Sequence, residues 1–356
     1  MVEHSELQAE ALRRKGHDVR IIMGNDPPGQ FTRTLHPRHG RDGPPPPEII
    51  PIGRSVIVPA NGTLPNIILS PRSYFRIRDS LAHERFDVVH LHEPMTPTPC
   101  IATLATYTGP MVGTFHASGD LGWMRIAKRV WGFLADRIDH RIAVSEMART
   151  SAQRWLPGDY EIVPNGVLIP PVAEAGAREN RIVFAGRHER RKGLHVLLGA
   201  WPEIRRRTGV ELRIIGADPL RVRLLMRRMR ISEDGVEVLG FLSQERLTQE
   251  LLAAKALVAP SLGGESFGMV LTRAMACATP VVASDIAGYR DVMTPHTAVA
   301  FPAADEDALA DAVEGLLADE PRRAAMGVAG RRLAHEKWAW DALADRLVSI
   351  YEAAAA

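Results

Sequence analysis

Short apolar runs alternate with longer amphipathic segments along most of the chain. In the first half, strand-like runs cover residues 17–23, 48–59, 86–91 and 111–115, and helix-like segments cover residues 5–15, residues 73–83 and the stretch after Pro99. Apolar strands that alternate with amphipathic helices predict a parallel sheet with helices on both faces. Such a sheet binds ligands at the carboxyl ends of its strands.

The alternation stops at residues 168–180, which are rich in Pro, Ala and Gly, and it restarts beyond them. The later strand-like runs cover residues 181–185, 211–215, 236–239, 256–260 and 280–283. We therefore predict an α/β protein of two doubly wound, Rossmann-like domains that face each other across a cleft. Residues 1–167 form the first domain, residues 168–180 the hinge and residues 181–338 the second domain.

Composition narrows the classes of function. The 356 residues carry a formal net charge of +2, with 46% apolar and 24% charged residues, so the overall charge does not favour nucleic acid as a partner. The two cysteines, Cys100 and Cys277, lie far apart, which argues against a disulfide framework or a metal site and fits a reducing cytoplasm. The sequence has no apolar run of about 20 residues and no segment of signal-peptide type, so we expect a cytoplasmic protein.

Two glycine-containing turns carry the candidate chemistry. Residues 263–268, Gly-Gly-Glu-Ser-Phe-Gly, lie between a strand-like run and a helix-like run. Backbone N–H groups at a helix start bind phosphate, and Glu265 beside them suits hydroxyl groups, so this turn predicts a sugar-nucleotide site. In the turn at residues 186–193, Arg187 and Lys192 could clamp a diphosphate. The alternatives are an ordinary strand-to-helix turn with a capping Glu, and a solvated basic turn.

The spacing of these two turns resembles a known enzyme family. Gly186-Arg187 and Lys192-Gly193 are followed about 70 residues later by the turn at 263–268, and then by Ala-x-Ala-x-x-Thr-Pro-Val-Val-Ala-Ser-Asp. This order is similar to the donor-binding half of retaining glycosyltransferases of the GT-B fold, glycosyltransferase family 4. The pattern is most similar to the phosphatidylinositol α-mannosyltransferases of actinobacteria. Further shared landmarks make the resemblance cover almost the entire chain, and they lie at residues 59–62, 90–94, 114–118, 143–145 and 164–167.

The resemblance implies roles for individual residues. Arg187 and Lys192 would neutralise the diphosphate, Glu265 would hold hydroxyls of the transferred sugar, and His116 would lie near the anomeric carbon. Further contacts with the nucleotide sugar are expected from Gly264, Phe267, Gly268, Met269, Val270 and Arg273. The donor is expected to be GDP-mannose, with no metal and no other cofactor. Residues 339–356 are expected to form a terminal helix that crosses back to the first domain.

The chain departs from the family pattern at three places. Arg273 stands where the family usually has a second Glu that grips the ribose, which puts ribose recognition in doubt; a solvent-exposed Arg is the alternative. The family's first strand and Gly-Gly loop would precede residue 5, so by this pattern a first strand is missing, through a late start codon or a degenerate protein. Ala60 and Asn66 replace a usual Tyr and a usual basic residue, whereas Asn61 could still bind the acceptor together with His116.

Three other patterns have a functional and a structural interpretation. The basic residues 72–78 and the amphipathic stretch 123–141 could contact a membrane or pack on a core. The arginines at residues 221–230 form a basic face without interleaved aromatic residues, which argues against nucleic acid. His90 and His92 share one face of a strand and permit a metal site, but a third ligand of obvious spacing is missing. His116 could equally be a structural histidine.

The sequence therefore predicts a retaining hexosyltransferase. We expect it to move mannose from GDP-mannose to a hydroxyl of phosphatidylinositol or a related lipid, peripherally at the cytoplasmic face of the membrane. The alternatives are a glycosyltransferase with another nucleotide sugar and a soluble or polyol acceptor, a sugar-nucleotide epimerase, and a non-catalytic sugar-nucleotide binder.

Overall fold

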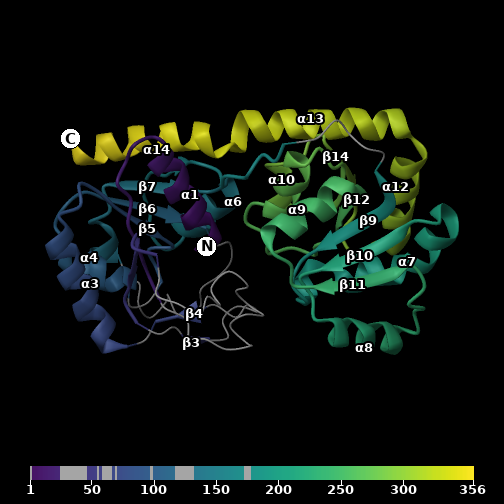
Figure 1. Ribbon diagram of the computed structural model, residues 1–356, viewed down its shortest axis with the longest axis horizontal. Helices are drawn as coiled ribbons and strands as arrows, with labels where there is room; N and C mark the ends of the chain where they lie inside the picture. The colour runs from purple at the N-terminus through teal and green to yellow at the C-terminus, as the bar shows by residue number, and fades with distance from the viewer. Residues whose placement is uncertain are drawn as a thin grey trace. The chain divides into compact units, whose positions relative to one another are not determined.

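The chain forms two compact units (Figure 1). Unit 1 comprises Met1–Gly166 and Trp340–Ala356, and unit 2 comprises Val167–Ala339. The computed structural model describes residues 2–24, 46–53, 56–57, 66–68, 70–96, 99–116, 132–171 and 178–356. Both units contain parallel sheets and helices, which confirms the predicted α/β class.

A four-stranded parallel sheet of order β5-β6-β7-β8 forms the centre of unit 1. Its strands are β5 (Val89–His92), β6 (Met111–Phe115), β7 (His140–Ala143) and β8 (Glu161–Ile162). The unit also contains a parallel pair, β1 (Ile21–Met23) and β2 (Ile49–Pro51), an antiparallel pair, β3 (Val56–Ile57) and β4 (Asn66–Ile67), and the helices α1 (Val2–Arg14), α3 (Pro71–Glu84), α4 (Pro99–Thr106), α6 (Glu146–Gln153) and α14 (Trp340–Ala355). All residues of β6 are buried, as expected for a central strand of a covered sheet.

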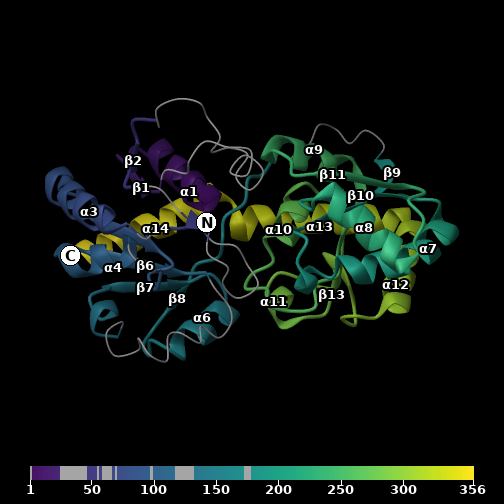
Figure 2. The same cartoon turned by 90° about the horizontal axis from the view of Figure 1, so that it is seen from below.

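Helix α14 completes the core of unit 1 although it comes from the other end of the sequence. It packs beside α1 and against β6 (Figures 1 and 2). The core that they share contains buried residues of α1, the sheet and α14, namely Ala11, Leu12, Val112, Ile142, Val163, Trp340, Leu343, Ala344, Leu347 and Ile350. At Gly166 an added Cβ would lie 2.4 Å from the Trp340 ring, so this position requires a residue without a side chain.

The prediction of an amphipathic helix over residues 123–141 is wrong for the last residues of that stretch. Residues 117–131 lie outside the described residues, and the helical residues described after them are 132–135, where the helix ends. Residues 140 and 141 instead begin β7, which pairs in parallel with β6. The carboxylate of Asp139 accepts a 2.7 Å hydrogen bond from the backbone N–H of Met111, and this bond fixes the start of the strand pairing. Sheet pairing therefore overrides the helical spacing of the apolar residues here.

Unit 2 is built on a six-stranded parallel sheet of order β11-β10-β9-β12-β13-β14 (Figure 1). Its strands are β9 (Glu179–Ala185), β10 (Glu211–Ile215), β11 (Val236–Gly240), β12 (Ala254–Ala259), β13 (Val281–Ser284) and β14 (Ala298–Phe301). Its helices are the 3-10 turn η1 (Arg190–Lys192), α7 (Leu194–Thr208), α8 (Pro219–Met229), α9 (Gln244–Ala253), α10 (Met269–Ala276), α11 (Ala287–Arg290), α12 (Glu306–Ala318) and α13 (Glu320–Trp338). Ile182, Val183 and Phe184 of β9 are all buried, so this strand is covered on both faces.

The strand order of unit 2 reverses between its two central strands. The chain winds outward from β9 to β10 and β11, returns to β12 on the other side of β9, and continues outward to β13 and β14. In open α/β sheets, ligands bind at such a reversal, beyond the carboxyl ends of the strands on either side. The two segments that leave these carboxyl ends are residues 186–193 and residues 260–268. They contain both turns that the sequence singles out.

Within the described residues, none of the helices combines the length and the apolarity needed to cross a bilayer.

Candidate functional site

Residues 186–193 and 260–268 form the loop pair, which lies at the strand-order reversal of unit 2. The backbones of the two loops are in direct contact. Gly193 has φ +69°, and an added Cβ there would lie 1.7 Å from the carbonyl oxygen of Pro260. The N–H of Leu262 donates a 2.7 Å hydrogen bond to the carbonyl oxygen of Arg191. The two turns that the sequence singles out therefore lie side by side, with their backbones in contact.

Charges of both signs meet in the loop pair. Oε1 of Glu265 lies 2.6 Å from Nζ of Lys192 and 3.0 Å from Nη1 of Arg191. Glu189 pairs with Nη1 of Arg187 at 3.0 Å and with Nε of Arg191 at 2.8 Å. The Glu265 side chain is only 9% exposed, whereas that of Arg187 is 47% exposed. Each of these three cations thus has a carboxylate partner within the loop pair, and an anionic ligand would have to exchange with those partners.

The turn before α10 is fixed by contacts with α11. An added Cβ on Gly288 would lie 1.9 Å from the carbonyl oxygen of Glu265, so the two backbones touch. The buried hydroxyl of Tyr289 lies 2.7 Å from Oγ of Ser261, which also donates to Oε1 of Glu265 at 3.4 Å. Burial raises the pKa of the Tyr289 phenol, so this group stays protonated and available for hydrogen bonding. The carboxylate of Glu265 is therefore held by side chains from both loops, and α11 supports the backbone of Glu265.

The remaining predicted donor contacts lie along the start of α10. Gly268, with φ +81°, caps the helix, and Phe267 before it is buried. Met269 and Val270 form the first turn and are partly buried, while Gly264 is exposed. A helix start of this kind offers backbone N–H groups and a positive dipole end to an anion.

Arg273, which stands at the usual ribose-binding position, lies in the second turn of α10 and is partly buried. The alternative, in which this side chain points into solvent, would make it fully exposed. Its partial burial does not fit that alternative. Contact with a ribose stays a prediction for this residue.

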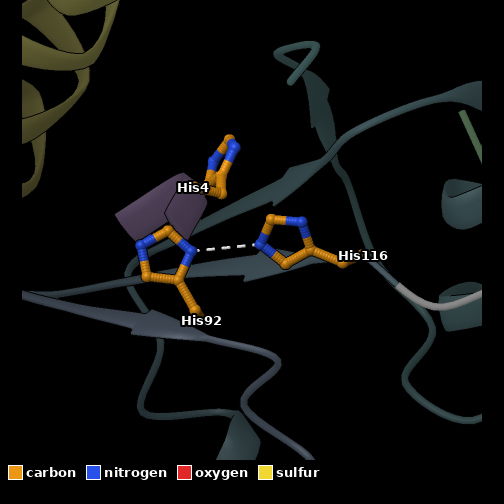
Figure 3. A group of neighbouring side chains, drawn as sticks. All are labelled: His4, His92 and His116. Atoms are coloured by element: carbon orange, nitrogen blue, oxygen red, sulfur yellow. Dashed lines mark hydrogen bonds between the residues drawn. The ribbon is translucent and has the colours of Figure 1, made fainter. Parts of the chain in front are cut away.

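His116, the predicted reacting-face residue, follows β6 in unit 1. Its backbone N–H donates a 3.0 Å hydrogen bond to Oε2 of Glu93, and its ring hydrogen-bonds to Asn165. Nε2 of His116 lies 3.0 Å from Nδ1 of His92 (Figure 3). Glu93 itself has φ +57°, a strained conformation for a residue with a side chain. The ring of His116 is thus held by two side chains, and its backbone is held by a third.

His4, His92 and His116 form the histidine cluster (Figure 3). They come from α1, β5 and the end of β6, and their ring centroids are 5.1–5.6 Å apart. His90 stacks on His92 with a centroid distance of 4.5 Å, so the expectation that they share a face is confirmed. His90 itself hydrogen-bonds to Thr114 and Tyr351 rather than joining the cluster.

Burial keeps the histidine cluster uncharged near neutral pH. Removal from water lowers the pKa of His92 to about 4, and it lowers the pKa values of His4 and His116 well below their ordinary value. The neighbouring imidazoles lower the pKa values of His4 and His116 further. A neutral His116 offers one ring N–H donor and one ring nitrogen acceptor.

Several predicted features lie elsewhere or outside the described residues. Asn61, the predicted acceptor contact, lies outside them, as do residues 123–131 of the amphipathic stretch 123–141. The basic stretch 72–78 lies in the first part of α3, on which Phe75 is 53% exposed beneath the guanidinium of Arg78. The arginines at residues 221–230 lie on α8 and just after it, on the surface.

Sequence reasoning missed four residues of the loop pair and its support: Glu189, Arg191, Ser261 and Tyr289. The only signal for Arg191 was its place beside Lys192 in a run of basic residues. Tyr289 lies more than 20 residues from the turn that it supports, so no local pattern marks it.

Comparisons with known proteins match both units. The family model described as Glycosyltransferase Family 4 matches residues 1–168, and the one described as Glycosyl transferases group 1 matches residues 179–319. A phosphatidyl-myo-inositol mannosyltransferase of Mycobacterium leprae is 33% identical over 364 residues, covering 98% of this chain and 91% of that protein. A GDP-mannose-dependent monoacylated alpha-(1-6)-phosphatidylinositol monomannoside mannosyltransferase of Corynebacterium glutamicum is 34% identical over 46% of this chain and 44% of its own length.

A solved structure of similar fold is the sucrose-phosphate synthase of Thermosynechococcus elongatus. Its TM-score is 0.75 at 22% identity, with 97% of this chain and 91% of that chain covered. This likeness confirms the GT-B fold that the sequence motifs predict.

Proposed function

The chain belongs to glycosyltransferase family 4, and we propose that it transfers mannose from GDP-mannose to a hydroxyl of phosphatidylinositol or a mannosylated form of it. The relatives that are similar over nearly the whole chain are named for this class of acceptor. The Corynebacterium glutamicum relative is named for the donor. We further propose retention of the anomeric configuration and a site of action at the cytoplasmic face of the membrane.

The loop pair is the observation that carries the proposal. It gathers Arg187, Arg191 and Lys192 beside the start of α10, at the strand-order reversal where α/β sheets bind nucleotides. Cations and helix N–H groups together suit a diphosphate. The carboxylate of Glu265 accepts hydrogen bonds, which suits the hydroxyl groups of a sugar attached to that diphosphate.

The proposed chemistry depends on stabilising the departing diphosphate. When the donor binds, its phosphates would take over Lys192 and Arg187 from their carboxylate partners, and Glu265 would become free to hold sugar hydroxyls. The cations then stabilise the charge that develops on the leaving group, a role that needs no metal ion. The neutral ring of His116 would orient the sugar at the reacting face, and its hydrogen bonds to His92 and Asn165 limit its rotation.

Donor binding is tested by calorimetry with GDP. Arg187→Ala and Lys192→Ala should each weaken GDP binding by about 1.5–3 kcal/mol, because each removes a charge-assisted contact. Lys255→Ala is the matched control, since Lys255 bonds to Asn180 away from the loop pair. Unchanged GDP affinity in both loop variants would contradict the diphosphate site.

Transfer is tested with radiolabelled GDP-mannose and vesicles that contain phosphatidylinositol. Label should enter the lipid fraction only when phosphatidylinositol is present. Transfer to a soluble polyol instead would favour the alternative acceptor class. Tight GDP binding without transfer to any acceptor would favour a non-catalytic sugar-nucleotide binder, and a change in the sugar of the donor itself would favour an epimerase.

A further inference from the structure

We propose that the histidine cluster of His4, His92 and His116 binds one divalent transition-metal ion of the zinc class, meaning Zn²⁺ or its neighbours Co²⁺, Ni²⁺ and Cu²⁺. This ion takes no part in the proposed transfer chemistry, for which the loop pair supplies the positive charge, although its ligand His116 has a proposed role there. Its binding can be tested without reference to any reaction.

The positions of the three rings carry the proposal. Each ring presents one nitrogen, and these nitrogens all lie within 4.8 Å of one another (Figure 3). Zinc binds histidine nitrogen at about 2.0–2.1 Å, so two nitrogens on one tetrahedral ion lie about 3.3 Å apart. The separation of 3.0 Å between Nδ1 of His92 and Nε2 of His116 is already close to that value. The third nitrogen, on His4, lies within 4.8 Å of both, so the His4 ring would have to rotate to bring it to ligating distance.

His4 supplies a second, independent observation. Its Nδ1 atom is buried and has no hydrogen-bond partner among the described residues. A buried polar atom without a partner is costly, and such atoms are rare in folded proteins. The His4 ring packs edge-on against both other rings of the cluster. A metal ion shared with those rings would give the buried His4 imidazole a polar partner within the cluster.

The surroundings hold the other two ligands in the manner of a metal site. Ligating histidines are generally oriented by hydrogen bonds from further residues. His116 is held by Asn165, which is buried, and through its backbone by Glu93. The ring of His92 lies against His90, which is itself fixed by Thr114 and Tyr351.

The donor set selects the class of ion. The three ligand atoms are imidazole nitrogens, which suit Zn²⁺, Cu²⁺, Ni²⁺ and Co²⁺, whereas Mg²⁺ and Ca²⁺ prefer oxygen ligands. The nearby carboxylate of Glu93 accepts from the backbone N–H of His116. With three protein ligands the ion would keep a coordination position open for water or another small ligand.

Metal binding would interfere with the role proposed for His116, and this consequence rests on the proposed function. A ring nitrogen bonded to metal can no longer accept a hydrogen bond, and the ring would be drawn toward His4 and His92. We therefore expect zinc to inhibit mannosyl transfer and chelation to restore it.

The binding experiment uses the full chain, free of any purification tag, after treatment with EDTA and its removal. Zn²⁺ is titrated in by calorimetry, and Co²⁺ is titrated in parallel with its visible absorption as the readout of coordination. We expect about one ion per chain with saturable binding. Mg²⁺ in excess should not displace it.

The variants His4→Ala and His92→Ala test the ligands separately. Each should weaken Zn²⁺ binding by about tenfold or more, because losing a ligand costs at least as much as losing a supporting contact. His296→Ala is the matched control, because His296 is exposed in unit 2. Circular dichroism checks that each variant is folded, and Ala is well tolerated at position 4 because α1 is helical there.

Two outcomes would overturn the metal site. One is the absence of saturable Zn²⁺ binding to the wild-type chain. The other is binding of equal strength in the wild type, in His4→Ala and in His92→Ala, which would place the ion elsewhere. Transfer assays are read separately: if no mannosyl transfer is found, the proposed function fails while the titration still decides the metal site. If transfer occurs, zinc should inhibit the wild type at lower concentrations than His4→Ala.

Discussion

The loop pair of unit 2 and the histidine cluster of unit 1 hold polar groups by opposite means. In the loop pair the groups are charged, and each cation is balanced by Glu189 or Glu265 at 2.6–3.0 Å. In the histidine cluster the groups are neutral, because burial lowers their pKa values. In the loop pair, an anionic ligand can replace the carboxylates as the partner of the cations. In the histidine cluster, the rings become charged only when they bind a proton or a metal ion.

The two regions also differ in how the backbone supports them. The loop pair depends on two glycines: Gly193 allows the two loops to touch, and Gly288 allows α11 to touch the backbone of Glu265. The histidine cluster depends on packing between α1, β5, β6 and α14, with the Trp340 ring 4.9 Å from that of His4. A substitution at one of these glycines should therefore disturb the loop pair most. Protonation of the imidazoles should disturb the histidine cluster most.

The largest expected effect is that of Gly193→Ala. The new methyl group would collide with the carbonyl of Pro260, and the residue would also have to keep φ +69°. We expect the free energy of unfolding to fall by about 2–4 kcal/mol and GDP binding to be lost as the loops separate. Urea denaturation and calorimetry measure the two effects.

Gly209→Ala is the matched control for that change. Gly209 lies at the other end of α7 with φ +63°, but an added Cβ there meets nothing within 4 Å. It should cost only the conformational penalty of about 1–2 kcal/mol and leave GDP binding intact. Equal effects of the two substitutions would show that contact between the loops is unimportant.

Glu265→Gln should separate sugar binding from phosphate binding. The amide keeps the shape of the side chain but no longer neutralises Arg191 and Lys192, so GDP should bind at least as tightly as before. GDP-mannose should lose about 1–3 kcal/mol relative to GDP, because sugar hydroxyls lose a charged acceptor. Glu189→Gln, which also releases a cation pair, should leave that ratio unchanged. A ratio that falls equally in both variants would contradict the role of Glu265.

The smallest expected effect is an acid sensitivity of unit 1. The pKa of His92 is about 4 in the folded chain and near 6.5 when unfolded, so the unfolded state binds more protons between these values. The contribution of the neutral His92 to the free energy of unfolding should therefore be fully present above about pH 6.5 and be lost as the pH falls toward 4. Between pH 7 and pH 5 this loss should amount to about 1–2 kcal/mol. Denaturation in EDTA at several pH values measures this slope. His92→Gln should make this slope shallower, while His4 and His116 keep their own lowered pKa values, and the exposed-site variant His296→Gln should leave it unchanged. Equal slopes in all three chains would rule out the burial of a neutral His92.

The sequence predicts the fold and the loop pair well, because their signals are local. Each strand of unit 2 from β9 to β13 overlaps a strand-like run of the sequence, and the two turns keep Arg187, Lys192 and Glu265 within short motifs. The expected family is confirmed by the matches over both units. The roles of individual site residues, the donor and the acceptor stay predictions.

The histidine cluster could not be predicted, because its members are brought together only by tertiary packing. His90 and His92 pointed to one strand face, but the other two members of the cluster, His4 and His116, come from other elements. The start of β7 was missed for a similar reason. Its pairing with β6 decides its conformation, and that pairing leaves no periodic signal in the sequence.

Helix α14 imposes an order on synthesis and folding. The ribosome makes it after the whole of unit 2, yet Trp340, Leu343 and Leu347 are buried in the core of unit 1. A nascent chain that has emerged only as far as α13 therefore holds all the residues of unit 2 but leaves apolar surface of α1 and β6 uncovered. Domains usually fold in the order of their synthesis. Here we expect the later-made unit 2 to fold first, and residues 1–166 to be the segment on which chaperones act until translation ends.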